Sequence, residues 1–323
     1  MRKRAVIRRI RQVMEKHLAY LVFFIIPRLS RRSVLALSRG LGWLYLRLDR
    51  RGRAVALENL SLAFGRELTA AEQAQLLPQI YRTFSLTFLD LFWFSRNTAE
   101  RLDKWVQLDE SAREYQDKAP AIVITAHFGS WEAGGLTVSR HFSALTSVAM
   151  PLVNPAIDRM LNNLRSTTGQ VVVPREGALK KLITCLRKGG NVAILPDQNT
   201  LPHEGGVFVN FFGLPVPVTR AGAALAQRAG VNIVFMFCLA DENGVYRAYC
   251  RRENTIAQAE VSGCSETELT QRIINVIEAE IRRHPDAWLW MYKRWRFIPE
   301  GVSGEGYPSY ARRKDKSKLQ EAV

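Results

Sequence analysis

The 323-residue sequence has few of the features that mark secreted, metal-binding or membrane-spanning proteins. It holds only four cysteines and no Cys-x-x-Cys pair, so we predict neither a disulfide framework nor a structural zinc site. No apolar run approaches the roughly 20 residues that a transmembrane helix needs. Hydrophobic residues still make up 47% of the chain, which is typical of a globular protein and excludes disorder throughout.

Acidic residues are scarce at the start of the chain. The net charge of the whole chain is +16, and residues 1–53 hold 15 Lys and Arg against two acids, Glu15 and Asp49. This segment therefore carries +13, whereas the remaining 270 residues carry only +3. A basic front end on a near-neutral protein indicates a partner rich in phosphate, either a nucleic acid or a membrane surface.

The same front end contains an uninterrupted apolar block. Residues 18–26 are nine apolar or aromatic residues in a row, and residues 34–48 form a second, Leu-rich patch with Trp43 and Tyr45. Nine helical residues rise about 14 Å, which is roughly half of the hydrocarbon core of a bilayer. We therefore expect a helix lying in the membrane interface, with a short tilted span and an ordinary buried helix as alternatives. Membrane binding is favoured over nucleic-acid binding, because basic residues flanking aliphatic ones are typical of contact with anionic lipid.

Short apolar segments alternate with helical patterns through the middle of the chain. Strands are expected at residues 121–126, 147–150, 170–173, 191–195 and 232–239. Helices are expected at residues 69–94, 131–141, 155–167, 177–188, 220–229 and 267–283. This alternation predicts an α/β fold with a mainly parallel central sheet flanked by helices, preceded by the membrane-associated helical segment. The predicted division is a membrane-anchoring segment 1–53, a domain 54–300 and a flexible basic tail 301–323.

A candidate catalytic motif follows the first predicted strand. His127 and Glu132 stand five positions apart at a strand-to-helix turn, with Gly129 and Ser130 between them. If Ser130 caps the helix, Glu132 falls in its first turn, where its carboxylate can accept a hydrogen bond from one imidazole nitrogen. The other nitrogen is then left as a general base. Gly129 allows close backbone approach, and amides at the helix start are candidates for stabilising an oxyanion.

Two other interpretations of this motif remain open. A buried histidine beside an unrelated acid has the same pattern, and Ser130 is conceivable as a nucleophile. The sequence has no Gly-x-Ser-x-Gly elbow, however, so a capping role for Ser130 is simpler. Two-histidine metal spacing is absent, and we expect no metal and no cofactor.

The six residues from His127 to Glu132 resemble the His-x-x-x-x-Asp/Glu motif of the bacterial lipid A late (lauroyl/myristoyl) acyltransferases, within the wider glycerolipid acyltransferase-like group. Further blocks resemble the family in the same order. They include Asn154-Pro155 with Asp158, Arg165, Arg175, Pro196-Asp197-Gln198, Gly206 to Val209, Phe211-Phe212-Gly213, Thr219, Trp290, Lys293 to Arg296, and Pro299-Glu300-Gly301. The resemblance covers about residues 15–301.

The resemblance implies an O-acyltransferase that moves a fatty acyl chain from a thioester to a hydroxyl of a lipid A precursor. It implies action at the cytoplasmic face of the bacterial inner membrane, with acyl-carrier protein or acyl-CoA as donor and a membrane lipid as acceptor. His127 and Glu132 would be catalytic. The residues expected to bind substrate are Gly129, Asn154, Arg165, Arg175 and Asp197.

Two further functions are kept as alternatives. The first is acyl transfer to another lipid, such as a phosphatidylinositol mannoside or an ornithine-type lipid. The second is a non-enzymatic protein that binds membranes or nucleic acid. Trp288, Trp290 and Trp295 alternate with basic residues, a pattern found in single-stranded nucleic-acid binding, although a packed C-terminal segment also accounts for it.

Overall fold

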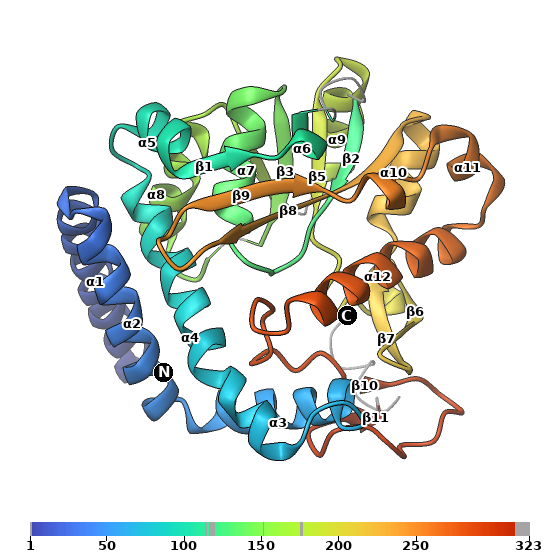
Figure 1. The fold of residues 1–323 in the computed structure, drawn as a ribbon, viewed down its shortest axis with the longest axis horizontal. Coiled ribbons are helices and arrows are strands. Elements are labelled where there is room, and N and C mark those ends of the chain that lie inside the picture. Colours follow the sequence, from blue (N-terminus) through green and yellow to red (C-terminus); the bar gives the residue numbers. More distant parts are fainter. Residues whose placement is uncertain (1, 114, 116–119, 151, 175–176, 314–323) are drawn as a thin grey trace.

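Helices cover both faces of a central sheet in the computed structural model (Figure 1). The structure describes residues 2–113, 115, 120–150, 152–174 and 177–313, with the backbone alone for 2–11 and 313. Among these residues the sheet has seven strands in the order β1-β9-β8-β2-β5-β3-β4. The strands are β1 (Val106–Leu108), β2 (Ala121–Ile124), β3 (Leu145–Ala149), β4 (Val171–Pro174), β5 (Asn191–Ile194), β8 (Asn232–Ala240) and β9 (Tyr246–Cys250). Only the β8–β9 pair is antiparallel, which confirms the predicted mainly parallel α/β fold.

The longer helices include those that the sequence pattern predicts, and α3 and α5, which it did not predict. They are α1 (Arg2–Ile25), α2 (Arg31–Leu48), α3 (Arg50–Phe64), α4 (Ala70–Trp93), α5 (Thr98–Trp105), α7 (Trp131–His141), α8 (Pro155–Ser166), α9 (Ala178–Arg187), α10 (Ala221–Ala229) and α12 (Glu266–Arg283). Short helices are η1 (Ile26–Arg28), α6 (Glu110–Arg113), η3 (Pro202–Glu204), η4 (Arg252–Asn254) and α11 (Gln258–Gly263). All five predicted strands and six predicted helices between residues 69 and 283 are confirmed to within two residues.

Local sequence explains these elements. Every residue of β2 and of β5 is buried, as expected for apolar strands in the middle of a parallel sheet. Thr69 and Glu72 form a capping box at the start of α4. Ser130 caps α7 by accepting a hydrogen bond from the backbone N–H of Ala133 at 3.3 Å, which favours the capping interpretation over a nucleophile.

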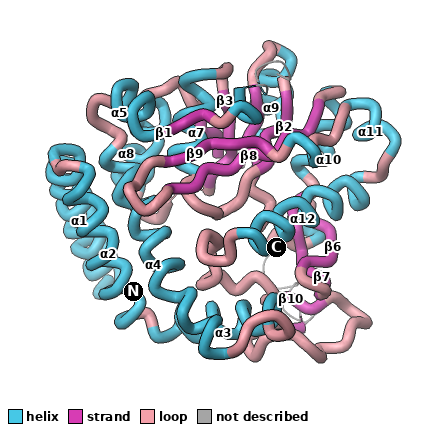
Figure 2. Tube along the Cα trace, viewed as in Figure 1, coloured by secondary structure: helices cyan, strands magenta, loops and turns pink. Residues whose placement is uncertain are grey.

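The sequence pattern did not predict an antiparallel hairpin of β6 (Gly206–Phe211) and β7 (Leu214–Thr219), which Figure 2 shows beside α12 and apart from the main sheet. Phe211 and Phe212 of the hairpin are buried in one aromatic cluster with Trp288, Trp290 and Trp295. These tryptophans are therefore core residues, and their faces are closed to nucleic-acid bases.

The N-terminal helices are attached to the domain by a buried charge network. Arg31 of α2 donates hydrogen bonds to Asp90 of α4 and to the carbonyl oxygen of Gly244. The Tyr246 hydroxyl donates to the other Asp90 oxygen at 2.6 Å, so α2, α4 and β9 meet at one carboxylate. The predicted boundary after residue 53 falls inside α3 and does not coincide with the end of an element.

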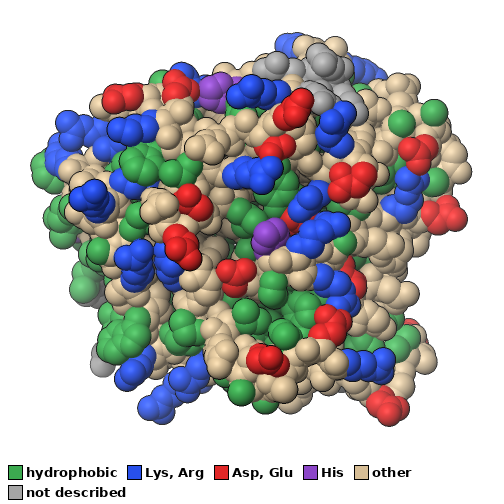
Figure 3. Space-filling view, in the orientation of Figure 1, with side chains coloured by type: hydrophobic (Ala, Val, Ile, Leu, Met, Phe, Trp, Pro, Cys, Tyr) green, Lys and Arg blue, Asp and Glu red, His purple; other side chains and the backbone are tan. Residues whose placement is uncertain are grey.

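One side of α1 and α2 nevertheless stays apolar and exposed, and Figure 3 shows hydrophobic side chains among Lys and Arg there. We call this the N-terminal apolar surface. Its residues are Val13, Met14, Leu18, Tyr20, Leu21, Phe24, Ile25, Leu41, Trp43, Leu44, Tyr45 and Leu48. The alternative of an ordinary buried helix at 18–26 is therefore wrong. No helix in the described part of the chain has the length and apolar character needed to cross a bilayer.

The C-terminal region does not become a loose tail at residue 301. The Tyr307 hydroxyl donates to the carbonyl oxygen of Pro215 at 2.8 Å, and the backbone N–H of Ser309 donates to Glu58 at 2.6 Å. A two-residue pairing of β10 (Phe297–Ile298) with β11 (Arg312–Arg313) follows. These hydrogen bonds hold the chain against α3 and β7, whereas residues 314–323 of the predicted tail lie outside the described residues.

Arg31→Ala is expected to lower the free energy of unfolding by about 3–5 kcal/mol, because it leaves the Asp90 charge buried without its cation. Urea unfolding followed by circular dichroism measures this. Arg32→Ala, an exposed neighbour on the same helix, is the matched control and should change little. Equal unfolding midpoints for the two variants would contradict this role of the network.

Candidate active site

Two neighbouring parallel strands bring the central residues together. Ile124 of β2 pairs with Ile194 of β5, and both strands end at this same edge of the sheet. His127 and Asp197 each lie three residues beyond that pair. Equal spacing from a shared register point therefore places the two side chains beside each other, at the edge where α/β proteins bind their ligands.

The Asp197 carboxylate holds His127 in one orientation. His127 donates to it twice, from Nδ1–H to Oδ1 at 3.0 Å and from its backbone N–H to Oδ2 at 2.9 Å. Trp288 Nε1–H adds a third donor to Oδ2 at 2.9 Å. Asp197 is only 2% exposed, and three donors compensate the cost of burying its charge. This fixes the proton on Nδ1 and leaves a lone pair on Nε2.

The predicted hydrogen bond between Glu132 and His127 is not formed. Glu132 instead accepts two hydrogen bonds from Arg165, from Nε at 2.9 Å and from Nη2 at 2.6 Å. The reason is the direction of α7, which turns the first-turn carboxylate towards the last turn of α8, where Arg165 lies. Asp197, predicted to contact substrate, holds the imidazole in its place.

The environment raises the pKa of His127 above its ordinary value. Burial alone would lower it, but the charge and hydrogen bond of Asp197, with a smaller contribution from the charge of Glu132, outweigh burial. The pKa of Asp197 is lowered: burial would raise it, and the interaction with His127 and the Trp288 hydrogen bond outweigh that. Glu132 thus acts on the imidazole through its charge, without contact.

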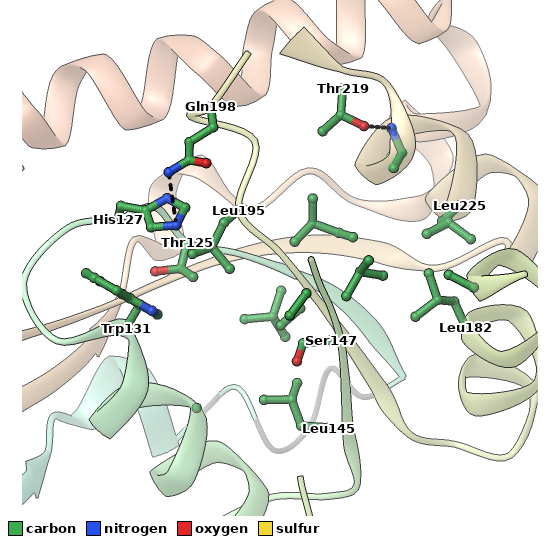
Figure 4. Close-up of a pocket in the computed structure, with 18 of the residues that line it drawn as sticks. Thr125, His127, Trp131, Leu145, Ser147, Leu182, Leu195, Gln198, Thr219 and Leu225 are labelled. Carbon is green, nitrogen blue, oxygen red and sulfur yellow. Dashed lines mark hydrogen bonds between the residues drawn. The ribbon is translucent and has the colours of Figure 1, made fainter. Parts of the chain in front are cut away.

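The free nitrogen of His127 faces a large cavity. The cavity has a volume of about 820 Å³, and its lining includes His127, Glu132 and Arg165. Gln198 lies 3.4 Å from His127 Nε2 through its side-chain nitrogen, and the rings of His127 and Trp131 meet edge to face at 5.0 Å. Figure 4 shows Gln198 and Trp131 on two sides of the imidazole, with apolar side chains such as Leu182 extending away from it.

Two residues that were predicted to bind substrate, Gly129 and Asn154, have structural roles. Gly129 has a φ of +54°, and a Cβ there would lie 2.2 Å from the carbonyl oxygen of Cys238. Its N–H donates to Ala287 O at 2.8 Å, so this amide is not free to bind an oxyanion. Asn154 caps α8 and donates to Gln12 O of α1 at 2.9 Å. Neither residue lines the cavity, and Arg175 lies outside the described residues.

Sequence reasoning overlooked other residues that build the site. Trp131, Gln198 and Trp288 contact the His127–Asp197 pair, yet none of them bears a charge or an ordinary catalytic group. Arg294 is fully buried nearby and donates to Asn199 Oδ1 at 2.9 Å; burial lowers its pKa to about 10. Only the position of Gln198 in the sequence could have indicated its role, because Gln198 directly follows Asp197 at the end of a strand.

No group of three or more His, Cys, Asp and Glu side chains could hold a metal ion within the described ranges. The site is instead a charged rim around His127 at one end of an apolar cavity. Such a site can take a proton from a ligand while an apolar chain fills the rest.

Residues 2–297 match the family model for bacterial lipid A biosynthesis acyltransferases. The chain belongs to this family. It is therefore an acyltransferase, as predicted, and the His127–Asp197 pair lies within the matched region.

Curated relatives agree with the family. The chain is 25% identical to the lipid A biosynthesis palmitoleoyltransferase of Escherichia coli K12 over 262 residues, which cover 79% of this chain and 82% of that protein. It is 25% identical to the lipid A biosynthesis lauroyltransferase of the same organism over 291 residues, covering 87% and 91%. A phosphatidylinositol mannoside acyltransferase of Mycobacterium tuberculosis H37Rv is 23% identical over 209 residues, or 62% of each chain.

A solved structure, the 1-acyl-sn-glycerophosphate acyltransferase of Thermotoga maritima, aligns with 80% of this chain and 99% of that one. The TM-score is 0.39 and the sequence identity 13%, so this likeness does not bear on the mechanism.

Asp197→Asn is expected to lower the pKa of His127, because removing the carboxylate charge disfavours the imidazolium. Glu132→Gln should lower it less, since Glu132 makes no hydrogen bond to the ring. A pH titration of the imidazole NMR signals, assigned with His127→Ala, measures both. A larger drop for Glu132→Gln than for Asp197→Asn would show that the pairing is wrong.

Proposed function

We propose that the protein transfers a fatty acyl chain from an acyl thioester to a hydroxyl of a lipid A precursor at the cytoplasmic face of the inner membrane, with His127 as general base. The observation that carries this proposal is the geometry of His127. Its Nδ1–H donates a hydrogen bond to the buried carboxylate of Asp197, and its Nε2 faces a cavity large enough for an acyl chain.

The proposed reaction uses only the two substrates and side chains of the protein. Nε2 of His127 takes the proton from the acceptor hydroxyl as the oxygen attacks the thioester carbonyl. The C–O bond forms, the tetrahedral intermediate collapses, and the C–S bond breaks. The imidazolium then returns its proton to the leaving thiolate, so the enzyme ends in its starting state. Asp197 keeps the required tautomer and stabilises the imidazolium in between.

Gln198 and the Glu132–Arg165 pair have separate roles in this proposal. The Gln198 amide donates towards Nε2 in the free site and gives way to the acceptor hydroxyl, which occupies the same position. Glu132 holds the Arg165 guanidinium at the cavity wall with two bonds. One Arg165 nitrogen, Nη1, makes only a 3.3 Å hydrogen bond to Asn162 and can be recruited by a phosphate of the acceptor.

The position of the cavity supports a lipid acceptor. Met150 and Leu152 line the cavity and are exposed, as is the neighbouring Val153. The Gln12 side chain of α1 donates to the carbonyl oxygen of Val153 at 3.3 Å, which ties this exposed apolar loop to the N-terminal apolar surface. An acceptor whose acyl chains lie in one leaflet can therefore reach the cavity past this exposed apolar loop.

For the donor we propose acyl-carrier protein, with acyl-CoA as the alternative thioester. Both are anionic, and the net charge of +16 favours their encounter with the protein. Arg220 and Arg228 belong to the cavity lining, where Arg220 also pairs with Glu266 at 3.1 Å. Steady-state rates with matched acyl-carrier protein and CoA donors separate the two.

A phosphatidylinositol mannoside is the second candidate acceptor. Its support is the similarity to the mycobacterial relative, whose name states that activity. Mass spectrometry of total lipids from cells with and without the gene distinguishes the candidates, because one lipid class loses an acyl group.

His127→Ala is expected to lower kcat by about 10²–10⁴-fold, the usual contribution of a general base. The matched control is His141→Ala at the surface end of α7, where the imidazole lies beside Asp103, and it should retain full activity. Transfer of radiolabelled acyl chains to a lipid A precursor measures both rates. Full activity of His127→Ala would exclude it as the base.

The N-terminal apolar surface gives a membrane prediction. Replacing Leu18, Leu21 and Phe24 together with serine should weaken binding to phosphatidylglycerol vesicles by about 10-fold or more, because three exposed apolar side chains lose their burial in lipid. Vesicle cosedimentation measures binding. Val171→Ser, an exposed apolar residue on β4, is the control. Unchanged binding of the triple variant would contradict this anchor.

A further inference from the structure

The cavity that holds His127 extends into a groove between α9 and α10, which pack against each other. From α10 the lining residues are Ala221, Ala224, Leu225 and Arg228, a spacing that places all four on one face of the helix. From α9 they are Ala178, Leu179 and Leu182. Figure 4 shows Leu182 and Leu225 in the same direction, away from His127 across the cavity.

The groove has room for a narrow chain and reaches the surface. Its alanines are small, and the positions from Ala221 to Arg228 extend about 10 Å along the helix axis. Leu179 on α9 and Arg228 on α10 both line the cavity and are exposed to solvent. A flexible arm whose thioester lies at His127 can therefore leave the protein between these two helices.

Arg228 differs from the other two arginines that line the cavity. Arg165 pairs with Glu132 at 2.6 Å, and Arg220 pairs with Glu266 at 3.1 Å. Within the described ranges Arg228 pairs with no acidic side chain. Its guanidinium is thus the lining cation that is available to an anionic group entering the groove.

The exposed face of α9 is strongly basic. Residues 178–188 hold four basic side chains and no acidic one, although the whole chain after residue 53 carries only +3. The four are all exposed and recur at helical spacing on one face, namely Lys180, Lys181, Arg187 and Lys188. Together with Arg228 they form a surface that we call the α9 basic face. It attracts an acidic partner.

The α9 basic face lies apart from the N-terminal apolar surface. α1 packs against α4 and α8, and Figure 1 shows α1 and α8 to the left, with α9 and α10 to the right. Only one large apolar residue of α9, Leu179, is exposed, so this face lacks the aliphatic block that characterises the membrane anchor. A protein bound over α9 therefore does not need to displace the lipid surface.

We propose that the α9 basic face docks an acidic carrier protein, whose acyl-bearing arm enters the cavity through the groove between α9 and α10. This inference rests on the acyl transfer proposed above and adds where the donor binds. Lys180 and Lys181 contact acidic side chains of the carrier. Arg228 binds the phosphate through which the arm is attached to the carrier.

The test compares three donors that carry the same acyl chain, on the full-length protein. They are acyl-carrier protein, acyl-CoA, and acyl-pantetheine, which has the arm without phosphate or protein. Reversing two charges together, by Lys180→Glu and Lys181→Glu, is expected to lower kcat/KM about 10-fold for the carrier protein, mainly through KM. The rate with acyl-pantetheine should stay the same, because this donor makes no contact outside the groove.

The matched control makes the same change of charge at another surface. Arg66→Glu with Arg312→Glu alters two exposed residues near α3 and β11, which Figure 1 shows at the other end of the molecule from α9. This variant should keep its rate with the carrier protein to within about twofold.

Arg228→Met tests the groove separately from the exposed face. It is expected to lower kcat/KM about 10-fold for acyl-carrier protein and for acyl-CoA, since both have the phosphate, and to spare acyl-pantetheine. The ratio of two donors measured on one sample does not depend on the fraction of the variant that is folded.

Several results would overturn docking on α9 while acyl transfer stands. They are no loss with the carrier protein in the Lys180–Lys181 variant, an equal loss with acyl-CoA or acyl-pantetheine, or a loss of vesicle binding in its place, which would make this face a membrane contact. An unaltered protein that transfers from acyl-CoA but not from the carrier also overturns it. Transfer from none of the three donors would overturn the proposed function itself.

Discussion

The pairing of β2 with β5 is the constraint on which the site depends. The two strands are buried and parallel, and Ile124 faces Ile194 in the register. Because His127 and Asp197 follow that pair at equal distance, the register alone brings the imidazole to its carboxylate. A shift of one residue would turn every side chain of a strand to the other face of the sheet, so the apolar core that holds the register also holds His127 beside Asp197.

The two acidic residues of the site, Asp197 and Glu132, have different partners. Asp197 is buried with three donors and fixes the imidazole, whereas Glu132 neutralises Arg165 at the cavity wall. Both carboxylates favour the protonated imidazole, but only Asp197 also determines which nitrogen carries the proton. Orientation and electrostatic support of the same ring thus come from different elements, the turn after β5 and the start of α7.

Much of this was readable from the sequence. Strand–helix alternation predicted the parallel sheet, and the motif at the end of the first predicted strand located His127. The partner of His127 could not be read, because Glu132 is near in sequence whereas Asp197 is 70 residues away and becomes a neighbour only through the register. The structural roles of Asn154 and Gly129 could not be predicted for a related reason, because the contacts of Asn154 with Gln12 and of Gly129 with Cys238 join segments that are far apart in the sequence. The hairpin of β6 and β7 gave no clear alternation, since Pro215 and Pro217 interrupt it.

Trp288 is synthesised after both His127 and Asp197, so the hydrogen bonds of Asp197 become complete only late in synthesis. Its indole is the last of the three donors to Asp197 to leave the ribosome, 91 residues after the carboxylate itself. A nascent chain that has completed β5 can bring His127 and Asp197 together, but it lacks this donor and the Ala287 carbonyl that receives the Gly129 amide. The apolar helices at the N-terminus are made first. The N-terminal apolar surface can therefore form before the His127–Asp197 pair has its full set of hydrogen bonds.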